Sequence, residues 1–188
     1  MSYQEVKRNI WSNAISNYVR TVLGMIVGLL TFRMLYQSMP PEQFGFWSLL
    51  WSVFGYGILL DFGFGFAAQK RVAELSVKQD WNELSRVLST ILFFYFGVAA
   101  AIVLVVLVAS RPIVGLFGVS AANSEEFRKV LILFFMGIGL AFPMGIFPEI
   151  LRGQQRIRLA NNLISVALVL RLVTLWLALK YQWGFFAV

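Results

Sequence analysis

The chain has 188 residues, of which 59% are hydrophobic and 13% are charged; this excludes a water-soluble globular domain, which is usually nearer to a quarter charged. The formal net charge is +7, yet the basic residues lie mostly in short loops between apolar runs, where they indicate membrane topology and contacts with anionic lipid instead of nucleic-acid binding. The sequence has no cysteine and no histidine, which excludes thiol nucleophiles, disulfides, imidazole bases and Cys/His metal sites and leaves no expectation of a metal or a cofactor.

Several apolar segments are long enough to cross a bilayer core as helices, at ~1.5 Å of rise per residue. Five such segments occupy residues 13–35, 44–66, 87–109, 128–150 and 161–181. Breaks that are polar or contain proline and glycine separate them, and the charged stretch at 69–86 is predicted to be an amphipathic helix or a helical extension. The sequence therefore predicts an all-α, polytopic helical membrane protein in which residues 1–188 form a single transmembrane bundle.

The distribution of lysine and arginine predicts the orientation in the membrane. With the N-terminus inside, nine basic residues fall on the inner side and five on the outer side, which favours a cytoplasmic N-terminus. Lys7 and Arg8 are followed by a long apolar stretch without a small-residue cleavage pattern, which indicates a lead-in to the first span and not a signal peptide. Because a new apolar stretch begins near Trp183, we expect the chain to be a fragment of a longer protein; a genuine five-span protein is the alternative.

Three charged residues lie well inside the apolar segments, away from the segment ends, namely Arg20, Asp61 and Arg171. An ionisable side chain in hydrocarbon costs at least ~2.5–3.5 kcal/mol by insertion scales, so each of them needs a partner or a wet cavity. Arg20 and Asp61 are expected at similar depth, where an ion pair would act as a brace or as a gate that breaks during transport. Arg171 has no acid at its depth in these segments, so it meets either a partner elsewhere in the protein or an anionic ligand.

Polar and small residues recur at spacings of three and four along the first segment, which places them on one helix face. They are Asn13, Asn17, Arg20, Gly24, Gly28 and Thr31. In the second segment the same spacing is shown by Gly57, Asp61, Gly65 and Ala68. Pro143 and Pro148 predict a bend in the fourth segment, as in helices that line cavities. Glu149 beside Arg152 is expected to form a surface salt bridge or a cap.

Short motifs distributed along the whole chain resemble those of a known group of transporters. The motifs are FGFWS at 44–48, GY at 55–56, LDFGFG at 60–65, RVAE at 71–74, RGQQR at 152–156 and NN at 161–162. Their order and spacing resemble the opening of the polysaccharide flippases, the O-antigen and oligosaccharide repeat-unit translocases of the multidrug/oligosaccharidyl-lipid/polysaccharide exporter superfamily.

The resemblance implies a transporter of two helical bundles around a cationic cavity, with this chain forming most of the first bundle. It implies a flippase that moves an undecaprenyl-pyrophosphate-linked oligosaccharide across the bacterial inner membrane for O-antigen, capsule or exopolysaccharide synthesis. The head group would be bound by Arg20 and Arg171, with Arg33 near the outer mouth, while Asp61 would pair helices or act as a gate. The implied partners are the lipid-linked glycan, the bilayer, a coupling H⁺ or Na⁺, and the missing C-terminal half or glycan-assembly proteins.

Other functions remain open on the sequence. A cation-coupled multidrug exporter of the same superfamily needs acids in the first bundle, and only Asp61 qualifies. An enzyme is not expected, because the only acidic pair, Glu125 and Glu126, lies in a predicted loop beside basic residues. A membrane scaffold subunit without transport is the remaining alternative, and it would tolerate exchange of Arg20 and Arg171.

Overall fold

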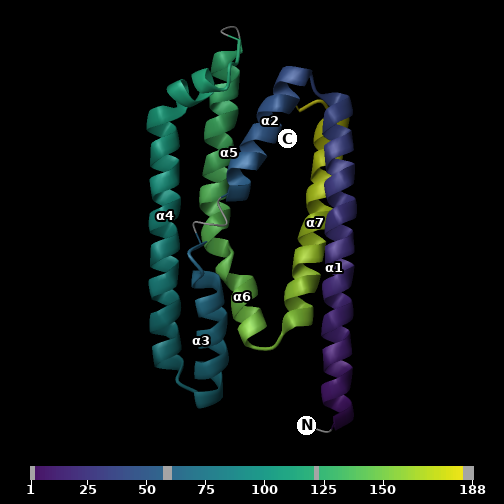
Figure 1. Cartoon of the computed structure of the whole chain (residues 1–188), viewed down its shortest axis with the longest axis vertical. Helices are drawn as coiled ribbons and strands as arrows, with labels where there is room; N and C mark the ends of the chain where they lie inside the picture. The colour runs from purple at the N-terminus through teal and green to yellow at the C-terminus, as the bar shows by residue number, and fades with distance from the viewer. Residues whose placement is uncertain (1–2, 57–60, 121–122, 184–188) are drawn as a thin grey trace. The chain divides into compact units, whose positions relative to one another are not determined.

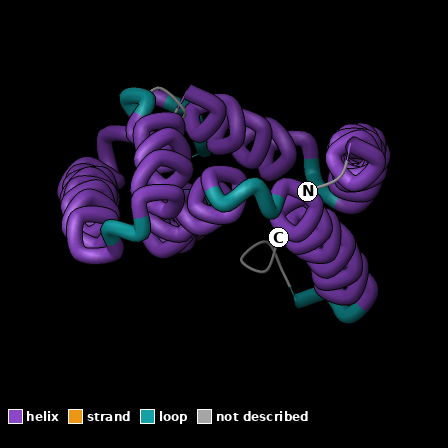
Figure 2. The backbone as a smooth tube through the Cα atoms, turned by 90° about the horizontal axis from the view of Figure 1, so that it is seen from below, coloured by secondary structure: helices purple, strands orange, loops and turns teal. Residues whose placement is uncertain are grey.

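The computed structural model describes residues 3–56, 61–120 and 123–183 of the chain, with side chains from residue 11 onward. Every regular element in these ranges is an α-helix (Figure 1, Figure 2). The helices are α1 (Tyr3–Ser38), α2 (Pro41–Gly55), α3 (Phe64–Lys78), α4 (Trp81–Leu116), α5 (Ser124–Met144), α6 (Ile146–Gly153) and α7 (Ile157–Lys180). The predicted all-α fold is confirmed.

Within the described ranges, four helical stretches are long and apolar enough to cross a membrane. They are Trp11–Ser38, Trp81–Leu116, Ser124–Gly153 and Ile157–Lys180. Ser124–Gly153 contains the predicted fourth segment, 128–150, and Ile157–Lys180 begins before the predicted fifth segment, 161–181, and ends one residue short of it. The chain is therefore a polytopic helical membrane protein, as the hydropathy pattern predicts.

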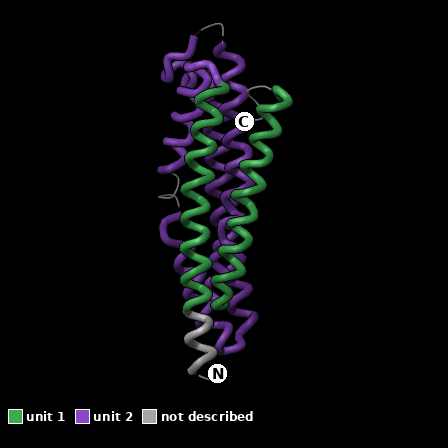
Figure 3. The backbone as a smooth tube through the Cα atoms, turned by 90° about the vertical axis from the view of Figure 1, so that its right-hand side faces the viewer, with its two compact units in different colours: residues 1–38, 154–188 green, residues 39–153 purple. Residues whose placement is uncertain are grey.

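The helices group into two compact units (Figure 3), one made of residues 1–38 and 154–188 and the other of residues 39–153. In unit 1, α1 packs along α7, and the Asn161 amide donates to the Ser16 hydroxyl at 3.1 Å. In unit 2, α4 packs against α5, and α3 packs against α4 and α6. The single bundle predicted for residues 1–188 stays a prediction.

The structure does not have the continuous helix predicted over 44–66. Helix α2 ends at Gly55, Asp61 to Gly63 form a turn, and α3 begins at Phe64; Gly57 lies outside the described residues. The turn places Phe62 at φ 48° and Gly63 at φ 79°, in the left-handed region that a right-handed helix cannot include. Asp61 therefore sits at a break between two helices and not on the face of one.

The proline-containing segments behave in two different ways. Helix α4 continues through Pro112 to Leu116, so the break predicted from residue 110 onward begins later than the sequence indicates. The bend predicted in the fourth segment is confirmed, because α5 ends at Met144 next to Pro143 and α6 begins after Gly145. At the bend the Gly145 N–H donates to the Phe142 carbonyl at 3.1 Å, which is a tighter turn than an α-helix makes.

Helix α6 meets α3 at a point where only a glycine fits. A Cβ on Gly153 would lie 2.6 Å from the Gln69 carbonyl oxygen and 2.7 Å from the Val72 Cβ. Val72 belongs to a buried cluster with Leu75 and Leu84, so it has no room to move away. This glycine belongs to the RGQQR motif and holds the end of α6 against α3.

We expect Gly153→Ala to destabilise the protein by ~1–3 kcal/mol, because the added methyl group overpacks a backbone contact. Gly97→Ala in α4 is the matched control, since a Cβ at Gly97 meets nothing within 4 Å and alanine is the better helix former. Thermal unfolding in detergent measures both variants. The close packing assigned to Gly153 is incorrect if its variant melts at the same temperature as the Gly97 variant or above it.

Glu42, in the first turn of α2, binds the turn that joins α4 to α5. Its carboxylate accepts from the Ser120 N–H at 2.9 Å and from the Asn123 amide at 2.7 Å. These donors, the Ser120 backbone first and the Asn123 side chain second, hold the Glu42 pKa below its usual value of 4.5.

Because the folded pKa of Glu42 is depressed, the carboxylate stabilises the fold above pH ~4.5, and this contribution is lost as the pH falls through the lower folded value. We expect the parent protein to melt higher than Glu42→Gln at pH 7 and the difference to vanish well below pH 4.5. Parallel thermal melts across this pH range provide the measurement. A difference that stays constant with pH would show that ionisation of Glu42 is not its source.

Candidate functional site

A cavity of about 780 Å³ lies within unit 2 and is lined by α2, α3, α4, α5, α6 and the turn before α3. Most of the lining surface is apolar. The polar lining residues are Asp61, Gln69, Tyr95, Glu149 and Arg152. Pockets of this size, with a few converging polar groups in an apolar wall, are the usual form of small-molecule sites.

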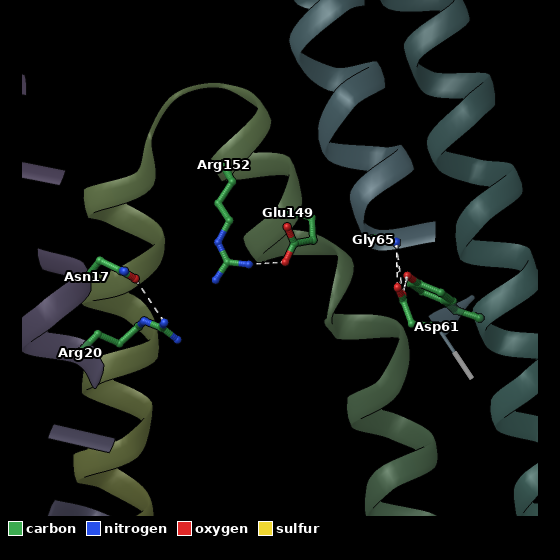
Figure 4. A network of polar contacts seen from close by, with 7 residues as sticks. Asn17, Arg20, Asp61, Gly65, Glu149 and Arg152 are labelled. Carbon is green, nitrogen blue, oxygen red and sulfur yellow. Dashed lines mark hydrogen bonds and ion pairs between the residues drawn. The ribbon is translucent and has the colours of Figure 1, made fainter. Parts of the chain in front are cut away.

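Asp61 is fixed in this cavity by donors from two helices. Its two carboxylate oxygens each lie 3.2 Å from the Gly65 backbone nitrogen, in the first turn of α3 (Figure 4). The Tyr95 hydroxyl of α4 donates to the same carboxylate. The carboxylate thus caps α3, whose N-terminal N–H groups and helix dipole favour a negative charge.

Tyr95 lines the cavity but is not among the site residues predicted from the sequence. The residue is only 3% exposed, and its ring packs edge-on against Phe142 with centroids 5.1 Å apart. It belongs to a buried cluster with Ala68, Ile91 and Ile146. The one signal in the sequence is a hydroxyl inside an apolar span, because a buried tyrosine hydroxyl needs a hydrogen-bond partner.

Glu149 and Arg152 form an ion pair on α6 (Figure 4). The predicted pairing is confirmed, but these side chains are only 18% and 28% exposed and line the cavity, so they do not form a surface bridge. Gly65 lies beside both acids, since a Cβ there would be at ordinary contact distance, 3.4 Å from the Asp61 oxygens and 3.5 Å from the Glu149 Cγ. Asp61 and Glu149 therefore border the same space.

The cavity combines two carboxylates with one guanidinium in a mainly apolar wall. Arg152 balances the charge of Glu149, and neutral donors stabilise Asp61. Electrostatic interactions are stronger in such surroundings than in water. With one carboxylate in excess, the arrangement suits a cation or a hydroxyl-bearing ligand better than an anion.

Arg20, predicted to bind an anionic head group, lies half-buried on α1 in unit 1. It is one turn beyond Ser16, which bonds to Asn161, and one turn before Gly24, where a Cβ would lie 3.8 Å from Leu168. The Arg20 Nη2 donates to Oδ1 of the Asn17 side chain at 3.2 Å (Figure 4). Its Nε is buried and has no hydrogen-bond partner among the described residues.

The other predicted site residues lie in more open positions. Arg171 is on α7, one turn beyond Leu168, and its residue surface is exposed. Arg33 is exposed near the end of α1. Arg20 and Arg171 thus belong to the same unit and to neighbouring helices. The ion pair predicted between Arg20 and Asp61 would join two units, and it stays a prediction.

Comparison with known protein families gives one match. Residues 13–177 match the family model described as MatE. Neither a search of curated proteins nor a search of solved structures gives a match. The matched range begins at Asn13 and ends at Leu177, so it includes the cavity of unit 2 and the three predicted arginines.

We expect Tyr95→Phe to destabilise the protein by ~1.5–3 kcal/mol, because it keeps the ring packing and removes a hydrogen bond to a buried carboxylate. Tyr56→Phe is the matched control, since Tyr56 lies beside the same break but is 74% exposed. Unfolding in detergent, by heat or denaturant, measures both. Equal stability of the two variants would mean that the Tyr95 hydroxyl contributes nothing through Asp61.

Proposed function

The chain belongs to the MatE family of membrane transporters, and from this premise we propose that it is a flippase for an undecaprenyl-pyrophosphate-linked oligosaccharide. The cargo would cross the bacterial inner membrane from the cytoplasmic face for surface polysaccharide synthesis. The chain would supply most of the first of two helical bundles, and its N-terminus would lie in the cytoplasm. The rest of the transporter would provide the second bundle.

The observation that carries this proposal is the Nε of Arg20, which has no hydrogen-bond partner in the described part of the chain. A buried donor without an acceptor costs ~1–3 kcal/mol, and more if it is charged, so the position favours a ligand that supplies an acceptor. A guanidinium presents its donors in a planar fork that matches phosphate oxygens. Arg20 uses Nη2 for Asn17, whereas its buried Nε has no acceptor among the described residues.

Arg171 and Arg33, the other two predicted arginines, would also attract an anionic head group, each at a different place. Arg171 lies on the helix that packs against α1, so a pyrophosphate bound at Arg20 would have a second cation on the neighbouring helix. Arg33 is exposed near the end of α1 and would attract the head group at the outer mouth. The polyprenyl chain would remain in the bilayer while the head group passes between charged residues.

A second candidate, a cation-coupled exporter of the same superfamily, is favoured by the cavity of unit 2. On the sequence only Asp61 qualified as a cation ligand, whereas the structure adds Glu149 across Gly65. A carboxylate in excess inside an apolar wall favours a cation over an anion. A flippase would also bind its coupling ion in this cavity. The two candidates therefore differ in the role of Arg20, which binds the cargo only in the flippase.

We expect Arg20→Gln to reduce surface glycan export roughly ten- to hundredfold, the effect of losing one charged hydrogen bond to phosphate. Arg111→Gln is the matched control, because it removes an exposed arginine of α4 and leaves the bundle packing intact. Export is measured as surface polysaccharide in cells that carry each variant in place of the parent gene, with protein levels compared by immunoblot.

The Asp61→Asn variant separates the two candidates in the same assay. If the flippase proposal is correct, Arg20→Gln loses glycan export at normal protein level. If instead Arg20→Gln exports glycan normally while Asp61→Asn abolishes cation-dependent efflux of organic cations, the exporter is the better account. If both variants export glycan fully and show no change in efflux, the chain is better described as a membrane scaffold subunit without transport.

A further inference from the structure

A separate groove lies in unit 1. It runs between α1, from Trp11 onward, and the start of α7. It has a volume of about 440 Å³. One wall is an apolar stripe on α1, made by Trp11, Ile15 and Val19 at successive turns. The other wall is polar and consists of Arg158 and Asn162, one turn apart on α7. None of the residues assigned to cargo binding lines this groove.

The floor of the groove is formed by two hydroxyl groups. Ser12 and Ser16 line it from α1, and the Ser16 hydroxyl accepts from the buried Asn161 amide at 3.1 Å. This bond joins α1 and α7 beside the groove. The groove thus follows the α1–α7 contact, with polar groups on one side and apolar groups on the other.

The groove lies where membrane head groups would be. The apolar segments that α1 and α7 contain begin near residues 13 and 161, so the groove residues lie around the start of both segments. Trp11 is 62% exposed, as expected of an aromatic residue at a membrane–water interface. Ahead of both segments the chain is basic, with Lys7 and Arg8 one turn before Trp11 and Arg156 before α7.

We propose that this groove binds an anionic phospholipid. The phosphate would accept from Arg158 and Asn162, the glycerol region would lie over Ser12 and Ser16, and an acyl chain would follow the apolar stripe of Ile15 and Val19. Basic pockets between spanning helices, at head-group depth, have the charge that anionic lipids require. The apolar wall favours a lipid over a free phosphate compound, because a soluble anion would leave Ile15 and Val19 uncovered.

The binding can be measured by native mass spectrometry of the 188-residue chain released from detergent. The probes are dioleoyl-phosphatidylglycerol, dioleoyl-phosphatidylcholine and soluble glycerophosphoglycerol. We expect the parent chain to retain phosphatidylglycerol in preference to phosphatidylcholine. Arg158→Gln should weaken that retention about fivefold, the usual effect of one basic residue near a membrane surface. Arg86→Gln should not, because Arg86 pairs with Glu83 on α4, outside the groove.

A second variant tests the groove independently of charge. Ser12→Phe fills the floor and keeps every basic residue, so it should also lose phosphatidylglycerol retention. The proposal is overturned if Arg158→Gln and Arg86→Gln weaken retention equally, because that would be a general surface-charge effect. It is also overturned if glycerophosphoglycerol displaces the lipid at equal concentration, because the site would then bind the anion alone.

Discussion

A carboxylate in apolar surroundings requires hydrogen-bond donors, and the Tyr95 hydroxyl and the Gly65 backbone N–H donate to Asp61. These contacts join the start of α3 to α4 and end the helix that the hydropathy pattern would otherwise continue. The left-handed conformations at Phe62 and Gly63 follow from this arrangement, because the chain has to turn before α3 can present its N-terminus to the carboxylate. The cavity in unit 2 exists where this turn leaves space beside α5 and α6.

The charged side chains of the two units suit different ligands. The cavity of unit 2 holds two carboxylates and one guanidinium, whereas Arg20 and Arg171 lie in unit 1 on neighbouring helices. A transporter that moves an anionic head group and uses a cation to drive it needs both kinds of site. The proposed flippase accommodates both, with the arginines assigned to the cargo and the acids to a coupling ion.

Hydropathy was sufficient to predict the helical fold, because each long apolar run must satisfy its own backbone hydrogen bonds in a membrane. It failed at 44–66 because LDFGFG is apolar and its small residues repeat at helical spacing, so nothing in the periodicity indicates positive φ angles. Tyr95 and Glu149 could not be predicted as neighbours of Asp61, since they lie 34 or more residues away and meet it only through packing. That the Nε of Arg20 has no partner among the residues that the structure describes is likewise a property of three-dimensional contacts.

The central claim is that Asp61 holds the start of α3. Amide hydrogen exchange at Gly65 tests it most directly, because the Gly65 N–H donates the hydrogen bond to the Asp61 carboxylate. The account predicts slow exchange at Gly65 in the parent protein, fast exchange in Asp61→Ala, and no change in Glu149→Gln. If the Gly65 amide exchanges at the same rate in Asp61→Ala as in the parent, Asp61 does not hold the start of α3, and the origin assigned to the helix break and the cavity is wrong.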